Sequence, residues 1–483
     1  MTVHARKVIG GMGWVALSHY ANRLLGFVST LILAKLLVPE DFGLVALAAM
    51  VVDVMKLFRD VGMGQALIHR REDVEKASHT AFYLLIGLNS LLYLAAVAVS
   101  PLIADYYNNP AVTMVLIITS SSLVWYSIRA VPEALVRKEV DFRKLVIPEV
   151  VPGVIATIVS IWMAYNGFGV WSLVVKSLIA DIMASVLIWR YTVFRPKLRY
   201  DWAIAKEMLH YGKYLLGSSI VMVVVYNIDR FYISKYEGLS ALGLYVLAFT
   251  IAGMPTTEVG HIVCRVMFPV FSKLNHDMER LRDVFLRTVR YSGLLVIPLS
   301  VGVAVYAEAF VRIFFGEKWA GMTFALQMLC IHALTRSLST VIHELYKATG
   351  QTRLVQRFSI GRLAMIGILG IPAVVSFGMD GIAILLALTY SVIFFVEAYF
   401  ACQFVGISTG KFLQQFSMPT IYSILTIGIV YFAIGSITPI LSTPTLILAV
   451  AVTIGSYFLV LGYLDKKTMT EFRQLITAMR SPG

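Results

Sequence analysis

The stretch RREDVEKASHTAFYLLIGLNSLLYLAAVAVSPLI (Arg70–Ile103) decides the fold, because a basic segment is followed at once by a long apolar run. No charged side chain occurs between Thr80 and Ile103. About 20 apolar residues in an α-helix cross the hydrocarbon core of a bilayer. The stretch therefore predicts one membrane-spanning helix, with Arg70, Arg71 and Lys76 in the loop before it.

The same pattern recurs along the whole chain. Hydrophobic residues make up 58% of the sequence and charged residues only 14%, which is unlike a soluble domain. We expect an all-α polytopic membrane protein with about 14 transmembrane helices. The predicted spans are residues 14–37, 42–63, 80–103, 112–132, 148–165, 168–189, 214–234, 242–263, 288–307, 322–343, 358–376, 380–402, 417–436 and 445–464.

Lysine and arginine alternate between rich and nearly empty loops. About 30 of the 41 basic residues fall in every second loop, and about 4 fall in the loops between them. One rich segment holds Lys347, Arg353, Arg357 and Arg362. Basic loops stay cytoplasmic during insertion, so we expect both termini on that side. The net charge of +13 then indicates topology and not nucleic-acid binding, because the charges are scattered over short loops.

Motifs for cofactors and catalysis are missing from the sequence. Cys264, Cys330 and Cys402 lie in apolar surroundings without metal-ligand spacing, and no phosphate loop, zinc motif or nucleophile elbow occurs. No small-residue cleavage site follows the first apolar stretch, so we expect no cleaved signal. We expect no metal, no cofactor and no enzymatic activity, and any pumping would use an ion, voltage or substrate gradient.

Two similar segments indicate an internal repeat. FGLVALA (Phe42–Ala48) resembles LGLYVLA (Leu242–Ala248), 200 positions later, although two apolar helices can match by chance. Two parallel six-span halves are a common transporter plan. The expected organisation is a first bundle (1–194), an amphipathic cytoplasmic linker (195–213), a second bundle (214–404), two extra spans (405–464) and a cytoplasmic tail (465–483).

Basic residues inside the apolar segments are the main functional signal. A charge at the bilayer centre costs about 2.5–3.5 kcal/mol on insertion scales, so it normally faces a bundle interior or a wet cavity. Arg23, Arg129 and Arg336 lie nearest mid-span, and arginine binds phosphate oxygens bidentately. We expect these three, with Lys56 and Asn22, to line a cavity for an anionic substrate. A structural role inside the bundle is the alternative for each.

Carboxylates and amides within the spans are candidates for ion coupling or gating: Asp229, Asn227, Asp53 and Glu397. Asp53 could instead form a helix pair with Lys56, three residues on. Asp229 could simply neutralise its neighbour Arg230, although successive helical residues point about 100° apart. Glu397 is either a proton site or a satisfied interior carboxylate, and the sequence leaves both open.

Several strings resemble a known family. They are AKLLVPEDFGLVALAAMVVDVMKLFRDVGMGQALIHRRE (Ala34–Glu72), NIDRFYISKYEGLSALGLYVLAFTIAGMP (Asn227–Pro255), VMFPVFSKLNHD (Val266–Asp277) and FFGEKWAGM (Phe314–Met322). Together they are similar to bacterial polysaccharide flippases of the Wzx and polysaccharide-transporter type, in the multidrug/oligosaccharidyl-lipid/polysaccharide superfamily. The resemblance covers nearly the whole chain and is nearest to the branch for exopolysaccharides such as colanic acid.

The resemblance implies two six-helix bundles around a central cavity, two added helices, and a place in the bacterial inner membrane. It implies a substrate, an undecaprenyl-diphosphate-linked oligosaccharide, and as partners membrane lipid, a polysaccharide polymerase and a chain-length regulator. Arg23 matches by position an arginine on the first helix of lipid II flippases. Asp229 matches an acidic cation-site residue on helix seven, but span 358–376 carries no acidic partner, which argues against sodium coupling and leaves a proton as the other candidate.

Three other functions compete with this interpretation. A multidrug exporter of the same superfamily should have an acid-rich cavity, whereas these spans hold comparable numbers of basic residues. A peptidoglycan lipid II flippase would differ in substrate only. A polysaccharide synthase would need a nucleotide-sugar domain, and polar stretches of about 20–25 residues are too short for one.

Overall fold

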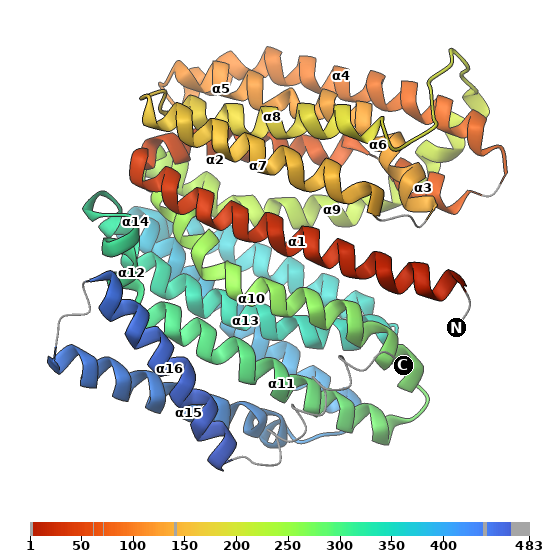
Figure 1. The fold of residues 1–483 in the computed structure, drawn as a ribbon. Coiled ribbons are helices and arrows are strands. Elements are labelled where there is room, and N and C mark those ends of the chain that lie inside the picture. Colours follow the sequence, from red (N-terminus) through yellow and green to blue (C-terminus); the bar gives the residue numbers. More distant parts are fainter. Residues whose placement is uncertain (1–2, 61, 71, 140–142, 438–441, 465–483) are drawn as a thin grey trace. The chain divides into compact units, whose positions relative to one another are not determined.

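A computed structural model describes residues 3–60, 62–70, 72–139, 143–437 and 442–464. Every regular element in these ranges is helical, as the apolar runs predict. The chain forms two compact units, Met1–Val246 and Leu247–Gly483 (Figure 1). The all-α membrane fold is therefore confirmed, and each unit is described by itself.

The first unit contains nine helices and the start of a tenth within its described residues. These are α1 (Val3–Leu36), α2 (Pro39–Arg59), α3 (Met63–His69), α4 (Val74–Tyr106), α5 (Ala111–Ser120), α6 (Ser122–Lys138), α7 (Arg143–Tyr165), α8 (Val170–Ile188), α9 (Trp202–Tyr236) and the first turns of α10 (Leu239–Leu274). Helix α7 packs between α1 and α8, and α4 packs on α5 and α6. This packing places α2, α6 and α8 around the charged residues described below.

The second unit continues α10 and adds α11 (Met278–Val305), α12 (Ala307–Phe314), the short 3₁₀ helix η1 (Glu317–Met322), α13 (Thr323–Ala348), α14 (Thr352–Val405), α15 (Thr409–Ile437) and α16 (Thr443–Leu464). Helix α13 packs on both α14 and α11, and α11 also packs on α15. Aromatic side chains fill this interior, among them Phe271, Phe285 and Phe412, which are fully buried.

Ten helices or runs of consecutive helices in the described residues are long and apolar enough to cross a membrane. One of them, α14, has 54 residues and a turn at Gly378, where φ is 61°. Only glycine adopts this backbone conformation without strain. Arg362 and Glu397, on opposite sides of that turn, bond to each other, so α14 is an antiparallel pair that matches the predicted spans 358–376 and 380–402. The exact count of 14 stays a prediction.

The predicted linker differs in part from the structure. Residues 195–201 are not helical, and Asp201 then caps α9 by accepting hydrogen bonds from the backbone N–H groups of Ala203 and Ile204 at 2.8 and 3.2 Å. Helix α9 continues without a break to Tyr236, so the second part of the linker joins the next span directly. The boundaries of the two predicted bundles stay predictions, and the tail 465–483 lies outside the described residues.

The repeated segment brings its two glycines together within the first unit. A Cβ on Gly43 would lie 1.8 Å from the backbone oxygen of Leu239, and a Cβ on Gly243 would lie 1.8 Å from that of Pro39. Pro39 and Leu239 are themselves 200 positions apart. This reciprocal contact, the glycine crossing, favours a true repeat over chance similarity, because the matched positions also meet in space.

We expect Gly43→Ala and Gly243→Ala each to lower the thermal unfolding midpoint of the purified protein. A methyl group 1.8 Å from a carbonyl oxygen must push the two helices apart, and overpacking costs about 1–3 kcal/mol or more. The matched control is Gly87→Ala in α4, where no atom lies within 4 Å and alanine should leave or raise the midpoint. A Gly43→Ala protein that melts with the Gly87→Ala control would contradict this account.

Candidate functional site

Charged side chains from α2, α6 and α8 meet around one tyrosine in the first unit. The Arg59 guanidinium carbon lies 3.8 Å from the centre of the Tyr126 ring, and that of Arg129 lies 5.8 Å from it. Arg129 Nη1 lies 3.6 Å from Asp181 Oδ1. We call Arg59, Tyr126, Arg129 and Asp181 the arginine cluster. A cation over an aromatic face is stabilised by the ring quadrupole, so Tyr126 holds Arg59 without neutralising it.

Two lysines lie on helices that contribute to the same cluster. Lys56 Nζ lies 2.8 Å from Asp53 Oδ1, which confirms the helix pair as a contact of these two candidates. Lys176 Nζ donates to Ser29 Oγ at 2.5 Å. Among the described residues, neither Arg59 nor Lys176 has an ion-pair partner. Neither group has a described carboxylate within ion-pair distance, although the charges of Asp60 and Asp181 lie near enough to act on Arg59.

The charged side chains of these pairs are partly exposed. The side chains of Arg129 and Asp181 are 26% and 25% exposed, and those of Lys56 and Asp53 are 41% and 34% exposed. A charge in contact with hydrocarbon is costly, so exposed charges inside spans line water-filled space. The arrangement can therefore bind a hydrated anionic group from one side of the first unit.

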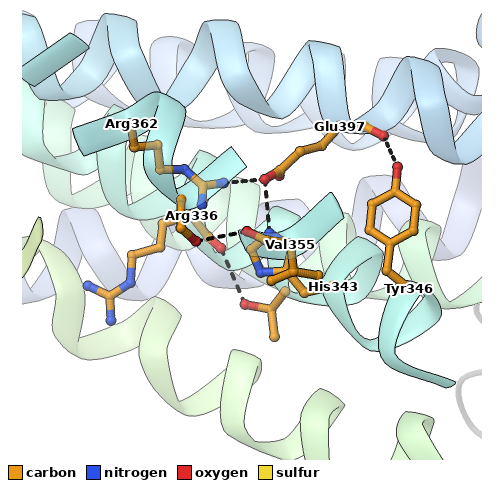
Figure 2. Close-up of polar contacts among 8 residues, drawn as sticks. Arg336, His343, Tyr346, Val355, Arg362 and Glu397 are labelled. Atoms are coloured by element: carbon orange, nitrogen blue, oxygen red, sulfur yellow. Dashed lines mark hydrogen bonds and ion pairs between the residues drawn. The ribbon is translucent and has the colours of Figure 1, made fainter. Parts of the chain in front are cut away.

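Three other predicted cavity residues lie on helices that contribute no member of the arginine cluster. On α1, Asn22 Nδ2 donates to the backbone oxygen of Glu149 at 3.2 Å, and Arg23 is exposed. Arg336 belongs to the second unit, on α13, and its guanidinium points away from Glu397 (Figure 2). A common cavity for Arg23, Arg129 and Arg336 stays a prediction.

Asp229 is a buried carboxylate with a neutral hydrogen-bond partner. Its side chain lies on α9, is 3% exposed, and accepts a hydrogen bond from Tyr245 Oη at 2.6 Å. Asn227 is also buried and donates to the Val223 backbone oxygen at 2.9 Å. Within the described chain, Oδ1 of each has no hydrogen-bond partner. Sequence reasoning missed Tyr245, although it lies in the repeated segment.

The second unit holds Glu397 in a fully buried position on α14. Its Oε1 accepts from Arg362 Nη2 at 2.5 Å and lies 2.9 Å from His343 Nε2 (Figure 2). The Tyr346 hydroxyl donates to the Glu397 backbone oxygen at 2.7 Å. We call Glu397, Arg362, His343 and Tyr346 the Glu397 cluster. These contacts satisfy Oε1 of Glu397, whereas its Oε2 has no hydrogen-bond partner among the described residues, so both interpretations stay predictions.

Arg362 lies inside a helix and not in a loop. The basic-residue count places it with the cytoplasmic residues Lys347, Arg353 and Arg357, whereas it is 5% exposed inside α14 and paired with Glu397. A carboxylate can hold an arginine in such a buried place, and the side of the membrane nearest to Arg362 stays a prediction. The signal in the sequence was the turn at Gly378, since a hairpin there places Arg362 opposite Glu397.

Metal-binding groups do not appear in the described part of the chain, where no three His, Cys, Asp or Glu side chains are placed to hold an ion. Cys264, Cys330 and Cys402 are free cysteines. The expectation that the protein uses no metal or cofactor stays a prediction.

The long apolar helices in both units define a multi-pass membrane protein. The chain belongs to the polysaccharide biosynthesis protein family, whose model matches residues 32–324. It is similar to the lipopolysaccharide biosynthesis protein WzxC of Escherichia coli K12, at 27% identity over 443 residues, 89% of this chain and 88% of that protein. It is also similar to the succinoglycan biosynthesis transport protein ExoT of Rhizobium meliloti, at 25% identity over 70% of this chain and 68% of that protein.

The fold has a solved counterpart in the lipid II flippase MurJ in its inward closed conformation. The TM-score is 0.73, and the match covers 94% of this chain and 99% of that one. At 15% identity this likeness shows the fold alone. The expected superfamily fold and the resemblance to polysaccharide flippases are confirmed.

We expect Arg362→Met to destabilise the protein strongly, because it leaves the buried Glu397 carboxylate without its arginine. Removing one partner of a buried pair costs about 3–5 kcal/mol, and Glu397→Gln added to Arg362→Met should restore much of that loss. The measurement is the free energy of unfolding, or the thermal midpoint, of the two single variants and the double variant. Arg287→Met is the matched control, since its pair with Asp283 is exposed and should contribute little. Additive effects of the two substitutions would disprove the coupling.

Proposed function

We propose that this protein is a flippase that carries undecaprenyl-diphosphate-linked oligosaccharide repeat units across the bacterial inner membrane for exopolysaccharide or O-antigen assembly. The observation that carries the proposal is the arginine cluster, which brings Arg59 and Arg129 together around Tyr126 in a member of this family. The similarity to WzxC, a lipopolysaccharide biosynthesis protein, and to ExoT, a succinoglycan biosynthesis transport protein, supports the polysaccharide pathway. The protein then acts without catalysis, and both of its termini are cytoplasmic.

The charge distribution suggests how such a substrate is held. A diphosphate presents several negatively charged oxygens, and arginine binds such oxygens in pairs through its planar fork. Arg129 and Arg59 are our first choice for this contact, with Lys56, Asn22, Arg23 and Arg336 as the further predicted contacts. The sugars remain hydrated while the prenyl chain stays in lipid, and alternating access exposes the cavity to each side in turn.

Two alternatives within the superfamily remain distinct. A lipid II flippase would use the same cationic contacts, so only a direct comparison of substrates separates the two functions. A multidrug exporter for cationic drugs is disfavoured by Arg59 and Lys176, because a positive charge repels a cation. The proposed partners are a polysaccharide polymerase and a chain-length regulator, which would receive the flipped unit.

We expect Arg129→Ala to slow flipping of a fluorescent undecaprenyl-diphosphate oligosaccharide in liposomes by about tenfold or more, since a charge-assisted hydrogen bond contributes about 1.5–3 kcal/mol. Arg129→Lys should restore only part of the rate, because lysine lacks the fork. In Arg129→Ala, the Asp181 carboxylate loses its cationic partner. Adding Asp181→Asn removes that unmatched charge, so the double variant should recover any loss of folding but should still flip slowly if Arg129 contacts the substrate. If a well-folded Arg129→Ala protein flips at the parental rate, Arg129 does not contact the diphosphate. If the unmodified protein flips only lipid II, the proposed oligosaccharide substrate is wrong.

We further infer that Asp229 is the coupling carboxylate. Asp53 and Glu397 form ion pairs with Lys56 and Arg362. The side-chain hydrogen bond of Asp229, in contrast, comes from the neutral Tyr245 hydroxyl, and its nearby charge is Arg230, the next residue in α9. A carboxylate whose hydrogen-bond donor is neutral can take up a proton or a sodium ion without first losing a hydrogen bond to a cation. Asn227, two residues away, would support a gating movement of α9.

We expect Asp229→Asn to abolish accumulation driven by an imposed proton or sodium gradient while downhill flipping continues. Tyr245→Phe, which keeps the carboxylate, should retain gradient-driven accumulation at a reduced rate. The comparison uses sealed vesicles with equal amounts of each protein. Unchanged accumulation by Asp229→Asn would leave Asp229 with a structural role only.

A further inference from the structure

A second polar site lies at the ends of three helices in the first unit. Glu40 in the first turn of α2, residues 106–109 at the end of α4, and residues 234–240 between α9 and α10 enclose a groove of about 460 Å³. This volume falls in the range of about 300–1,000 Å³ that small-molecule sites occupy. We call it the outer groove, because these segments lie in loops that the basic-residue pattern assigns to the non-cytoplasmic side.

Contacts between two of the three segments, the end of α4 and the end of α9, hold the outer groove in shape. The hydroxyls of Tyr107 and Ser234 share a hydrogen bond of 2.9 Å, and Lys235 Nζ lies 3.6 Å from the centre of the Tyr106 ring. Asn109 Oδ1 accepts from the backbone N–H of Ala111 at 3.0 Å, which fixes the start of α5. These bonds tie the end of α4 to the end of α9, so the lining is formed before any ligand arrives.

The lining has the chemistry of a carbohydrate site. Hydroxyls, amides and carboxylates from Ser240, Asn108 and Glu40 offer donors and acceptors to sugar hydroxyls. The two tyrosines add amphipathic rings that can cover the apolar faces of a sugar. Glu40 and Glu237 outnumber the one cation, Lys235, and Lys235 already lies over Tyr106. Such a charge balance suits a neutral glycan and disfavours a diphosphate.

We propose that the outer groove binds the oligosaccharide of the repeat unit as it emerges on the non-cytoplasmic side. This inference rests on the proposed flippase function and adds a site to it. The arginine cluster binds the charged diphosphate, and the outer groove binds the uncharged glycan. The two sites thus bind different parts of the head group. The outer groove keeps the sugars on the outer side while the diphosphate dissociates from the arginine cluster.

The test is binding of free oligosaccharide, without its lipid, to the full-length protein in nanodiscs. The probe is the repeat-unit oligosaccharide released by mild acid from the lipid-linked pool of the producing cells, followed by saturation-transfer NMR and calorimetry. We expect saturable binding that Tyr106→Leu combined with Asn108→Gly weakens at least tenfold. Glycine at 108 removes the amide and keeps the positive φ of 50° found there.

A matched control and a competitor make the outcomes distinct. Tyr165→Leu removes an exposed tyrosine at the end of α7, outside the groove, and should bind like the parent. Undecaprenyl diphosphate without sugar should not compete. The proposal is overturned if the parent binds no oligosaccharide, if the groove variant binds like the parent, or if Tyr165→Leu loses binding equally. Flipping of the lipid-linked substrate is a separate assay, so its failure would count against the proposed function and not against the groove.

Discussion

A charge held at the depth of a membrane must be matched by a partner or must face water, and this constraint orders the interior of both units. Glu397 meets it with Arg362 and His343 on neighbouring helices. Asp181 meets it with Arg129, and Asp229 meets it with the Tyr245 hydroxyl and the nearby charge of Arg230. The three solutions differ in how much charge is left over. Full matching gives a rigid interior, whereas incomplete matching leaves a group that a substrate or an ion can complete.

Every ion pair described here lies within a single unit, and this matters for the alternating access that we propose. A pair whose members belong to one bundle survives a rearrangement between bundles, so its desolvated charges are never separated. In the proposed cycle, accessibility therefore changes without exposing Glu397 to hydrocarbon. The groups proposed to meet the substrate, in contrast, are partly exposed, such as Arg129 and Lys56.

The sequence predicted the properties that follow from residue order along the chain, such as span length and loop charge. It predicted contacts between helices poorly. Span length and the order of basic loops predicted the helical membrane fold, because a bilayer imposes them residue by residue. Periodicity also placed Asp53 and Lys56 on one face, and the structure pairs them. It did not identify Arg362 as the partner of Glu397, or Tyr245 as that of Asp229, because helical periodicity shows which side chains share a face but not which faces meet.

The glycine crossing has a consequence for how such a chain could arise. Pro39 approaches Gly243 just as Leu239 approaches Gly43, so each side offers the other the same pair of positions. That is the arrangement of an isologous interface, which two identical molecules form around a twofold axis. A half-length ancestor with one copy of the segment could have dimerised through this contact. Gene fusion would then have joined the two subunits and kept the contact, with glycine retained on both sides because neither helix leaves room for a side chain.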